Sequence, residues 1–169
     1  MKEDIEKRTD NDIKINEINI IIADDEIKTC EEIKKILSEY NQIKILGIAN
    51  NDDEEIRMIE ELKPDVVITD LMRNHQFTGL NIIKNYAEKK ESPKFIVVSF
   101  TPDPGLCYRY KNISDCLYKY PKINGAELAY KIICAKRTIL KEKQELLQQK
   151  LIEKRKTIFW EKLKRMLFE

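Results

Sequence analysis

Short runs of apolar, largely β-branched residues alternate along the chain with amphipathic stretches. The almost unbroken apolar character of several of these runs is typical of strands buried on both faces. Five runs predict strands, at 18–23, 43–49, 65–69, 94–99 and 113–118. Apolar residues at helical spacing predict helices in between, at 26–40, between Asn51 and Pro64, and at 80–90. The segment 101–112 holds two prolines and a glycine and leaves room only for a short helix, whereas the chain from about 122 onward has a helical pattern.

Alternating strands and helices predict an α/β fold, a five-stranded parallel sheet that is doubly wound, with helices on both faces and a long C-terminal α-helix. We expect three parts. Residues 1–16 form a flexible polar arm, 17–134 the α/β domain, and 135–169 a basic amphipathic helical extension. In such sheets the ligand crevice lies outside the carboxyl ends of the strands, and functional side chains are therefore sought there.

Charge separates the extension from the rest of the chain. Residues 135–169 contain 11 Lys and Arg against 5 Glu, within a chain whose formal net charge is only +1, so the preceding part is acidic. The four cysteines form no CxxC pair, which argues against a zinc site or a disulfide framework and favours reduced thiols. No apolar run is long enough to span a bilayer. We therefore expect a cytoplasmic protein.

Polar side chains stand at the ends of four predicted strands. Asp24 and Asp25 follow the first strand, Asp70 the third and Lys119 the fifth, and Ser99 ends the fourth. Clustered carboxylates repel one another unless a cation neutralises them, and their hard oxygens suit Mg²⁺. Asp70 would then be a nucleophile toward phosphorus, with Lys119 offsetting charge and Ser99 donating a hydrogen bond. A single strand-end Asp is more often a helix cap or a loop residue, but five such residues together favour a shared site.

The segments IIADDE, VITDLM, VVSF and LYKYP resemble the receiver domain of two-component response regulators, over about residues 18–134. The resemblance implies a flavodoxin-like sheet of order 2-1-3-4-5. It also implies that Asp70 accepts a phosphoryl group from a sensor histidine kinase or phosphotransfer protein. Asp24, Asp25, Asp70 and the backbone carbonyl of Met72 would hold Mg²⁺. Such a domain is a signalling module and not an enzyme that turns over a metabolite.

Four features depart from the pattern of that family. Phe100 replaces a small residue beside the site, and Cys116 occupies the usual place of an aromatic switch residue. Tyr120 separates Lys119 from Pro121, and the loop before Gly79 is one residue longer. Tyr118 and Tyr120 flank the lysine and are candidates to replace the switch aromatic. Two readings follow, a working phospho-switch or a degenerate receiver that serves as a phosphorylation-independent dimerisation or interaction module.

Two further alternatives are weaker on the residues themselves. A Mg²⁺-dependent phosphatase on a similar fold is disfavoured because Met72, and no acid or base, stands two residues after Asp70. His75, the only histidine, is expected to be a solvated loop residue and not a ligand or a relay group.

The C-terminal helix carries an apolar stripe at heptad-compatible spacing, formed by Leu140, Leu147, Leu151 and Ile158. A helix of this length is not stable in water unless it buries such a stripe, so we expect a homodimer through residues 135–169 or docking on a partner. We do not expect nucleic acid or a membrane as a partner, because no helix-turn-helix is present and Lys/Glu-rich faces are usually solvated. A missing output domain is an open alternative.

Overall fold

The computed structural model describes residue 15 and residues 17–168. The arm predicted for 1–16 lies outside the described residues except for Ile15, which packs half-buried against the core. Strands and helices alternate in the order β1 Ile18–Ala23, α1 Ile27–Leu37, β2 Ile43–Ala49, α2 Asp52–Leu62, β3 Val66–Thr69, α3 Thr78–Ala87, β4 Lys94–Ser99, α4 Gly105–Arg109, β5 Ile113–Tyr118 and α5 Gly125–Phe168.

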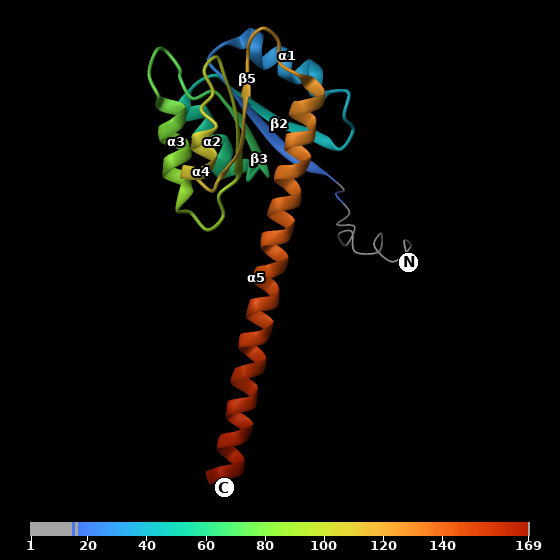
Figure 1. The fold of residues 1–169 in the computed structure, drawn as a ribbon, viewed down its shortest axis with the longest axis vertical. Coiled ribbons are helices and arrows are strands. Elements are labelled where there is room, and N and C mark those ends of the chain that lie inside the picture. Colours follow the sequence, from blue (N-terminus) through green and yellow to red (C-terminus); the bar gives the residue numbers. More distant parts are fainter. Residues whose placement is uncertain (1–14, 16, 169) are drawn as a thin grey trace, which may run out of the picture. The chain divides into compact units, whose positions relative to one another are not determined.

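The five strands form one parallel sheet in the order β2-β1-β3-β4-β5 (Figure 1). The predicted fold class and strand order are thereby confirmed. Strands β1, β3 and β4 occupy the middle of the sheet and are almost completely buried, which explains their unbroken apolar sequences. The edge strands β2 and β5 carry partly exposed residues, as expected where one side lacks a neighbouring strand.

Alternate residues of the central strands feed two hydrophobic cores, one on each face of the sheet. On one face, Ile20 and Ile22 pack with residues of α1 and of the first turns of α5, including Leu128 and Ile132. On the other face, Ile21, Val67 and Phe95 pack with residues of α2, α3 and α4, including Ile59, Ile83 and Leu106. Burial of this apolar surface from both sides fixes the register of the strands, and with it the positions of the residues that follow each strand.

Local hydrogen bonds set helix ends that the periodicity alone places less well. Helix α1 stops at Leu37, three residues before the predicted end, and the chain turns through a bond from the Tyr40 amide to the Leu37 carbonyl at 3.1 Å. Helix α5 begins at Gly125 and not near 122, because the Asn124 side chain caps it by accepting the Glu127 amide at 3.1 Å. Helix α2 ends at Leu62, before Pro64, and Lys63 adopts the left-handed conformation common at helix ends.

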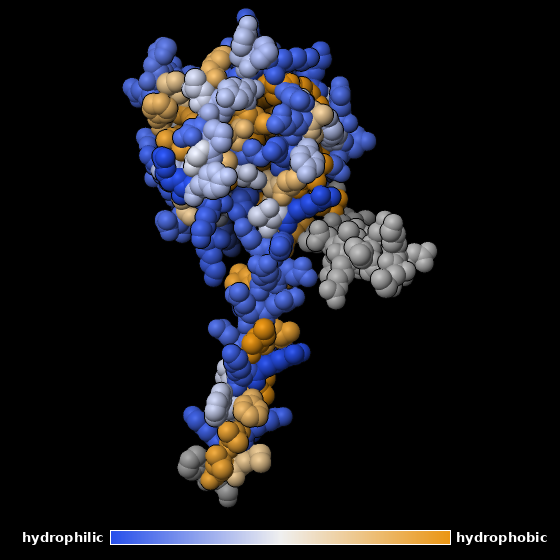
Figure 2. Space-filling model, in the orientation of Figure 1, coloured by the Kyte–Doolittle hydropathy of each residue, from blue (hydrophilic) through white to orange (hydrophobic). Residues whose placement is uncertain are grey.

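Contacts within the chain divide it into two units, residues 1–137 and 138–169. The second unit consists of the later turns of α5. Its apolar stripe is exposed, with 67% of Leu147, 51% of Leu151 and 44% of Ile158 accessible to solvent. Figure 2 shows apolar side chains of this helix interspersed with hydrophilic ones. Within the described part of the chain, no helix is long and apolar enough to cross a membrane.

Asn51 caps the first turn of α2, which lies beside the carboxyl edge of the sheet. Its Oδ1 accepts the amide of Glu54 at 2.9 Å, and the Glu54 carboxylate in turn accepts the amide of Asn50 at 2.9 Å. We expect Asn51→Ala to lower the free energy of unfolding by about 1 kcal/mol, measured by urea denaturation. Asn50→Ala is the matched control, because only its backbone takes part in this cap; an equal loss in both variants would contradict the capping role.

Candidate functional site

The predicted polar residues lie at the carboxyl ends of β1, β3, β4 and β5, at one edge of the sheet. The amide of Asp70 donates to the carbonyl of Ala23 at 3.1 Å, so that the ends of β3 and β1 lie directly side by side. The amide of Lys119 donates to the carbonyl of Ser99 at 2.9 Å and joins the ends of β5 and β4 in the same way. Asp24, Asp70, Ser99 and Lys119 are all buried at this edge.

The ammonium group of Lys119 bridges two carboxylates. Its Nζ lies 2.7 Å from Oδ2 of Asp24 and 2.7 Å from Oδ2 of Asp70. Burial alone would lower the pKa of Lys119, but the hydrogen bonds to both carboxylates outweigh burial and raise this pKa above its usual value. Lys119 is therefore held in its charged form by two anions at once.

One ammonium does not compensate the buried carboxylates completely. Burial raises the pKa of Asp24 above the usual value of 3.8, although the hydrogen bonds from Lys119 and from the Glu26 amide act in the opposite direction. The pKa values of Asp24 and Lys119 are thus both raised. The two directions agree, because Lys119 is stabilised by two carboxylates, whereas Asp24 shares this single lysine with Asp70. The site has more negative than positive charge, and it favours a further cation.

Asp25 adds a third carboxylate and completes a set of hard oxygen ligands. One carboxylate oxygen from each of Asp24, Asp25 and Asp70 lies within 4.8 Å of the others. Asp25 is exposed, whereas the other two are buried, so the cluster is open on one side. The residues present fit Mg²⁺, which binds one or two carboxylates, keeps several waters and requires an accessible site. The amide of Met72 donates to Oδ1 of Asp70 at 3.3 Å, which places the Met72 backbone beside the cluster.

Phe100 follows Ser99 directly and lies beside the lysine. Its ring centroid is 5.2 Å from Nζ of Lys119, within the range of a cation–π contact. The side chain is 58% exposed, so the ring forms part of the surface next to the buried charges. A small residue in this place would leave that space open.

Gly79 allows α3 to approach the backbone of Asp70. A Cβ atom at position 79 would lie 1.9 Å from the carbonyl oxygen of Asp70, a distance that no side chain tolerates. The residue is buried in the first turn of α3. Its lack of a side chain is thus a requirement of the close contact between α3 and the end of β3.

The structure also shows where the residues lie that depart from the receiver-domain pattern and where the only histidine lies. Tyr118 and Tyr120 are exposed, Cys116 is half-buried, and a cis peptide bond joins Tyr120 to Pro121. His75 is exposed in the β3–α3 loop and has a positive φ of 61°. Neither tyrosine is buried against the site, and the histidine is a solvated loop residue, as expected from the sequence.

Arg73 is a buried charged residue that the sequence interpretation did not single out. Its guanidinium donates to Oε2 of Glu55 and to Oδ1 of Asp52, both at 2.5 Å, and to Oγ1 of Thr69 at 2.6 Å. Only 3% of the Arg73 side chain and none of Glu55 is exposed. Burial raises the pKa of Glu55 and Arg73 opposes that rise, so the pair depends on mutual neutralisation.

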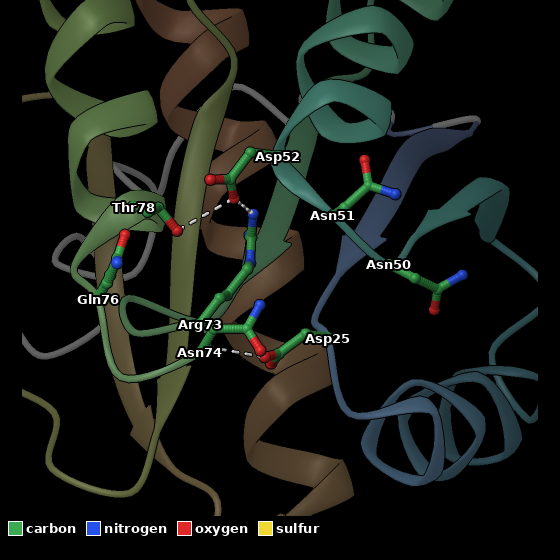
Figure 3. Close-up of a pocket in the computed structure, with 8 residues that line it drawn as sticks. All are labelled: Asp25, Asn50, Asn51, Asp52, Arg73, Asn74, Gln76 and Thr78. Carbon is green, nitrogen blue, oxygen red and sulfur yellow. Dashed lines mark hydrogen bonds and ion pairs between the residues drawn. The ribbon is translucent and has the colours of Figure 1, made fainter.

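This ion-pair cluster fixes the loop that carries Met72. Arg73 and Gln76 exchange two backbone hydrogen bonds of 2.9 Å across a tight turn with positive φ at Asn74 and His75. The Asn74 amide then donates to Oδ2 of Asp25 at 3.0 Å (Figure 3). The salt bridges to α2 thereby position a donor on one of the three clustered carboxylates.

A polar pocket of about 310 Å³ lies next to this loop. Figure 3 shows side chains from the ends of β1 and β2, from α2 and from the β3–α3 loop around it. Asp25 belongs both to this pocket and to the acidic cluster, so the pocket and the cluster are adjacent. Its lining residues are Asp25, Asn50, Asn51, Asp52, Arg73, Asn74, Gln76 and Thr78.

Fold and site together define a flavodoxin-like α/β domain with an acidic cluster at the carboxyl edge of its sheet. The family model for the response regulator receiver domain matches residues 20–120. Because this match spans more than half of the chain, the chain belongs to the response regulator receiver domain family. The resemblance seen in the sequence is confirmed, and a role in two-component signalling follows at the level of the family.

The chain is similar to curated proteins of different kinds. The chain is 31% identical over 84 residues to the transcriptional regulatory protein YdfI of Bacillus subtilis, covering 50% of this chain and 39% of that protein. It is 33% identical over 86 residues to protein-glutamate methylesterase/protein-glutamine glutaminase 3 of Geobacter sulfurreducens, covering 50% of this chain and 22% of that protein. The chain thus spans less than half the length of these relatives. Since one of them is an enzyme, the expectation that this chain is not an enzyme stays an expectation.

Among solved structures, RcsB from Salmonella enterica serovar Typhimurium, bound to promoter DNA in the presence of the phosphomimetic BeF₃⁻, matches with a TM-score of 0.57 and 23% identity. That match covers 71% of this chain and 98% of the other. A further structure holds two RcsB dimers bound to two parallel DNAs. At this identity the likeness shows the fold alone. The comparisons nevertheless give no support to the expectation that nucleic acid is not a partner.

Removing the arginine of the Arg73–Glu55 pair tests its energetic role. We expect Arg73→Met to lower the free energy of unfolding by about 3–5 kcal/mol, because Glu55 would remain buried without its counter-charge. The measurement is urea denaturation at neutral pH.

The double variant Arg73→Met with Glu55→Leu is the matched control, because it removes both charges from the same buried place. We expect it to recover most of the loss, since apolar replacement of a whole buried pair is often close to neutral. Equal destabilisation of the single and double variants would show that packing, and not charge pairing, explains the effect.

Proposed function

We propose that this chain is a phosphoacceptor signalling module in which Asp70 receives a phosphoryl group from a phosphohistidine of a sensor histidine kinase or phosphotransfer protein. The observation that carries the proposal is the contact of one buried ammonium, that of Lys119, with both Asp24 and Asp70. Membership of the receiver family supports the kinase as the class of partner. The signal would leave through a conformational change and through α5.

In the proposed reaction a carboxylate oxygen of Asp70 attacks phosphorus while the bond from phosphorus to the imidazole nitrogen of the donor breaks. The Asp70 carboxylate needs no general base, because it is used in its ionised form. Lys119 offsets the charge of the transferred group, and the Ser99 hydroxyl donates a hydrogen bond to one of its oxygens. The product is an aspartyl phosphate.

Transfer changes the partners of Lys119. While Asp70 is a free carboxylate, its Oδ2 accepts from Lys119 at 2.7 Å. Phosphorylation converts that carboxylate into an acyl phosphate and places phosphoryl oxygens nearby, so the ammonium exchanges a carboxylate partner for a phosphoryl one. The end of β5, where Lys119 stands, is therefore the first backbone segment expected to respond.

Asp24, Asp25, Asp70 and the backbone carbonyl of Met72 are the proposed ligands of Mg²⁺. When bound, this cation neutralises negative charge on the carboxylates and on the phosphoryl oxygens. The uncompensated charge of the acidic cluster, and the exposure of Asp25 on its open side, support such a cation. The ion pairs of Arg73 with α2 would keep the Asn74 amide hydrogen-bonded to Asp25 and hold the Met72 carbonyl in place.

A second candidate function is a phosphorylation-independent interaction module. It is favoured by Phe100, whose ring lies over Lys119 where the family pattern has a small residue. The presence of Cys116 in place of the aromatic switch residue also favours this alternative. This alternative keeps the fold and the charge cluster but gives Asp70 no acceptor role.

The exposed stripe of α5 supports self-association through residues 135–169. Leu147, Leu151 and Ile158 stand at spacings that would form the seam of a two-stranded coiled coil, although Gln144 and Lys154 interrupt it. The seam would bury apolar area that is otherwise solvated in this unit. A second copy of the chain is the proposed occupant, and RcsB, a neighbour in fold, is a dimer on DNA.

Phosphoryl transfer is tested on the full chain with Mg²⁺ and either acetyl phosphate or beryllofluoride. We expect intact-mass spectrometry to detect the addition of one phosphoryl group, and the phosphorylated peptide to contain Asp70. Asp70→Asn should abolish both the mass increase and beryllofluoride binding, because an amide cannot supply the attacking carboxylate.

Asp53→Asn is the matched control, because it removes an exposed carboxylate of α2 outside the site and should leave the labelling unchanged. Folding of each variant is checked by circular dichroism. No labelling of the unaltered chain by either reagent would favour the phosphorylation-independent module.

Self-association is tested by sedimentation velocity on the full chain and two charge-matched variants. Leu151→Glu places a carboxylate in the proposed seam and should shift the chain to monomer by at least tenfold in dissociation constant, which corresponds to about 1.4 kcal/mol. Gln149→Glu adds the same charge on the opposite side of the helix and should leave association unchanged. A monomeric unaltered chain at micromolar concentration, or equal effects of both substitutions, would exclude the seam.

A further inference from the structure

Two cysteines that do not form a CxxC motif lie close together between α4 and β5. Sγ of Cys107, in α4, lies 3.8 Å from Sγ of Cys116, in β5, and neither is in a disulfide. Both side chains are half-buried and pack against the core on the α4 side of the sheet. Cys116 also lies 3.5 Å from the carbonyl oxygen of Asp103, which holds its sulfur on the side that faces α4.

We propose that Cys107 and Cys116 form a modification site, at which peroxide oxidation joins the two thiols in an intramolecular disulfide that ties α4 to β5. A disulfide bond is about 2.05 Å long, so the sulfurs must approach by about 1.8 Å from their observed separation. Rotation about the Cα–Cβ bonds of two neighbouring cysteines moves the sulfurs over such distances. The Asp103 contact given up in this movement is a weak S–H hydrogen bond.

The oxidation balances with hydrogen peroxide as the oxidant. One thiolate attacks a peroxide oxygen, the O–O bond breaks, and a sulfenic acid forms while hydroxide leaves and is protonated to water. The second cysteine then attacks that sulfur, the S–O bond breaks, and a second water leaves. In total, two thiols and one peroxide give one disulfide and two waters, with two electrons passing from the sulfurs to the peroxide. A dithiol reductant reverses the reaction by exchange.

The environment of the pair sets its reactivity. Burial is the main cause that raises the pKa of both Cys107 and Cys116. The carboxylates of Asp115 and Asp103 add to the effect at Cys116, whereas Lys131, which pairs with Asp115 at 2.5 Å, opposes it at Cys107. Because the thiolate is the nucleophile, the first step is slow at neutral pH and accelerates as the pH rises. The second step is intramolecular between neighbouring sulfurs, so the sulfenic acid has a resolving partner at hand.

The position of the pair gives the disulfide a consequence that rests on the proposed function. Cys116 stands three residues before Lys119, on the strand whose end is expected to respond to phosphorylation of Asp70. Helix α4 is only five residues long, Gly105–Arg109, and contacts β5. A covalent link between them would limit their relative movement. Oxidation would therefore reduce the response of α4 to the phosphoryl group without changing the acceptor site itself.

Formation of the disulfide is tested on the native full chain by treatment with hydrogen peroxide, alkylation of remaining thiols and peptide mass mapping without reductant. We expect a linked Cys107–Cys116 peptide in the unaltered chain and in Cys134→Ser, and none in Cys107→Ser or Cys116→Ser. Cys134→Ser is the matched control because Cys134 is also half-buried but lies on α5. Alkylation of both thiols after treatment of the unaltered chain, or links to other cysteines or between chains, would overturn the proposal.

The consequence is tested by hydrogen exchange of α4 with and without Mg²⁺ and beryllofluoride, in the reduced and the oxidised chain. We expect the mimic to change exchange of α4 in the reduced chain and to change it several-fold less in the oxidised one. Equal responses would overturn the regulatory role while leaving the disulfide intact. If the reduced chain does not bind beryllofluoride at all, the proposed function fails, and the mass mapping still decides whether the disulfide forms.

Discussion

The sharing of one buried ammonium between two buried carboxylates is the constraint on which the functional edge of this domain depends. Lys119 contacts Asp24 and Asp70 equally, at 2.7 Å, and these three groups come from the ends of three different strands. Such an arrangement requires a fixed sheet register, because displacing Lys119 would leave two buried carboxylates without a counter-charge. The two apolar cores provide that fixed register. The incomplete compensation of Asp24 at the same time leaves this edge with an excess of negative charge.

Much of this arrangement could be predicted from the sequence, and the reason is geometric. Unbroken β-branched runs identify strands that are buried on both faces, and the carboxyl ends of parallel strands meet at one edge. Asp24, Asp25 and Asp70 are therefore brought together by any fold that keeps the strands in this order. Helix ends were predicted less well, as at Leu37 and Gly125, because local caps and turns decide them and periodicity does not report on those.

Two side-chain pairs of the structure could not be predicted, because the sequence around each residue gives no sign of its partner. Arg73 sits in a polar loop, and Glu55 ends a run of four acidic residues that is typical of a solvated first helical turn. Nothing in either segment indicates that both are buried and paired over 18 positions in the chain. Cys107 and Cys116 likewise have no motif spacing, and only the short α4 helix brings their sulfurs together. Long-range pairs of this kind leave no periodic pattern in a single sequence.

The distribution of strong contacts around Asp70 suggests where a change at that residue could be transmitted. On one side, the β3–α3 loop is held to α2 by charged hydrogen bonds of Arg73, and Gly79 packs directly on the Asp70 backbone. Movement of this loop or of α3 would break buried ion pairs or disturb the close packing of Gly79 on the Asp70 backbone. On the other side, β5 is an edge strand that ends in the exposed Tyr118, and α4 is a single short helix. A rearrangement that starts at Lys119 therefore meets less resistance toward α4 and β5 than toward α2 and α3.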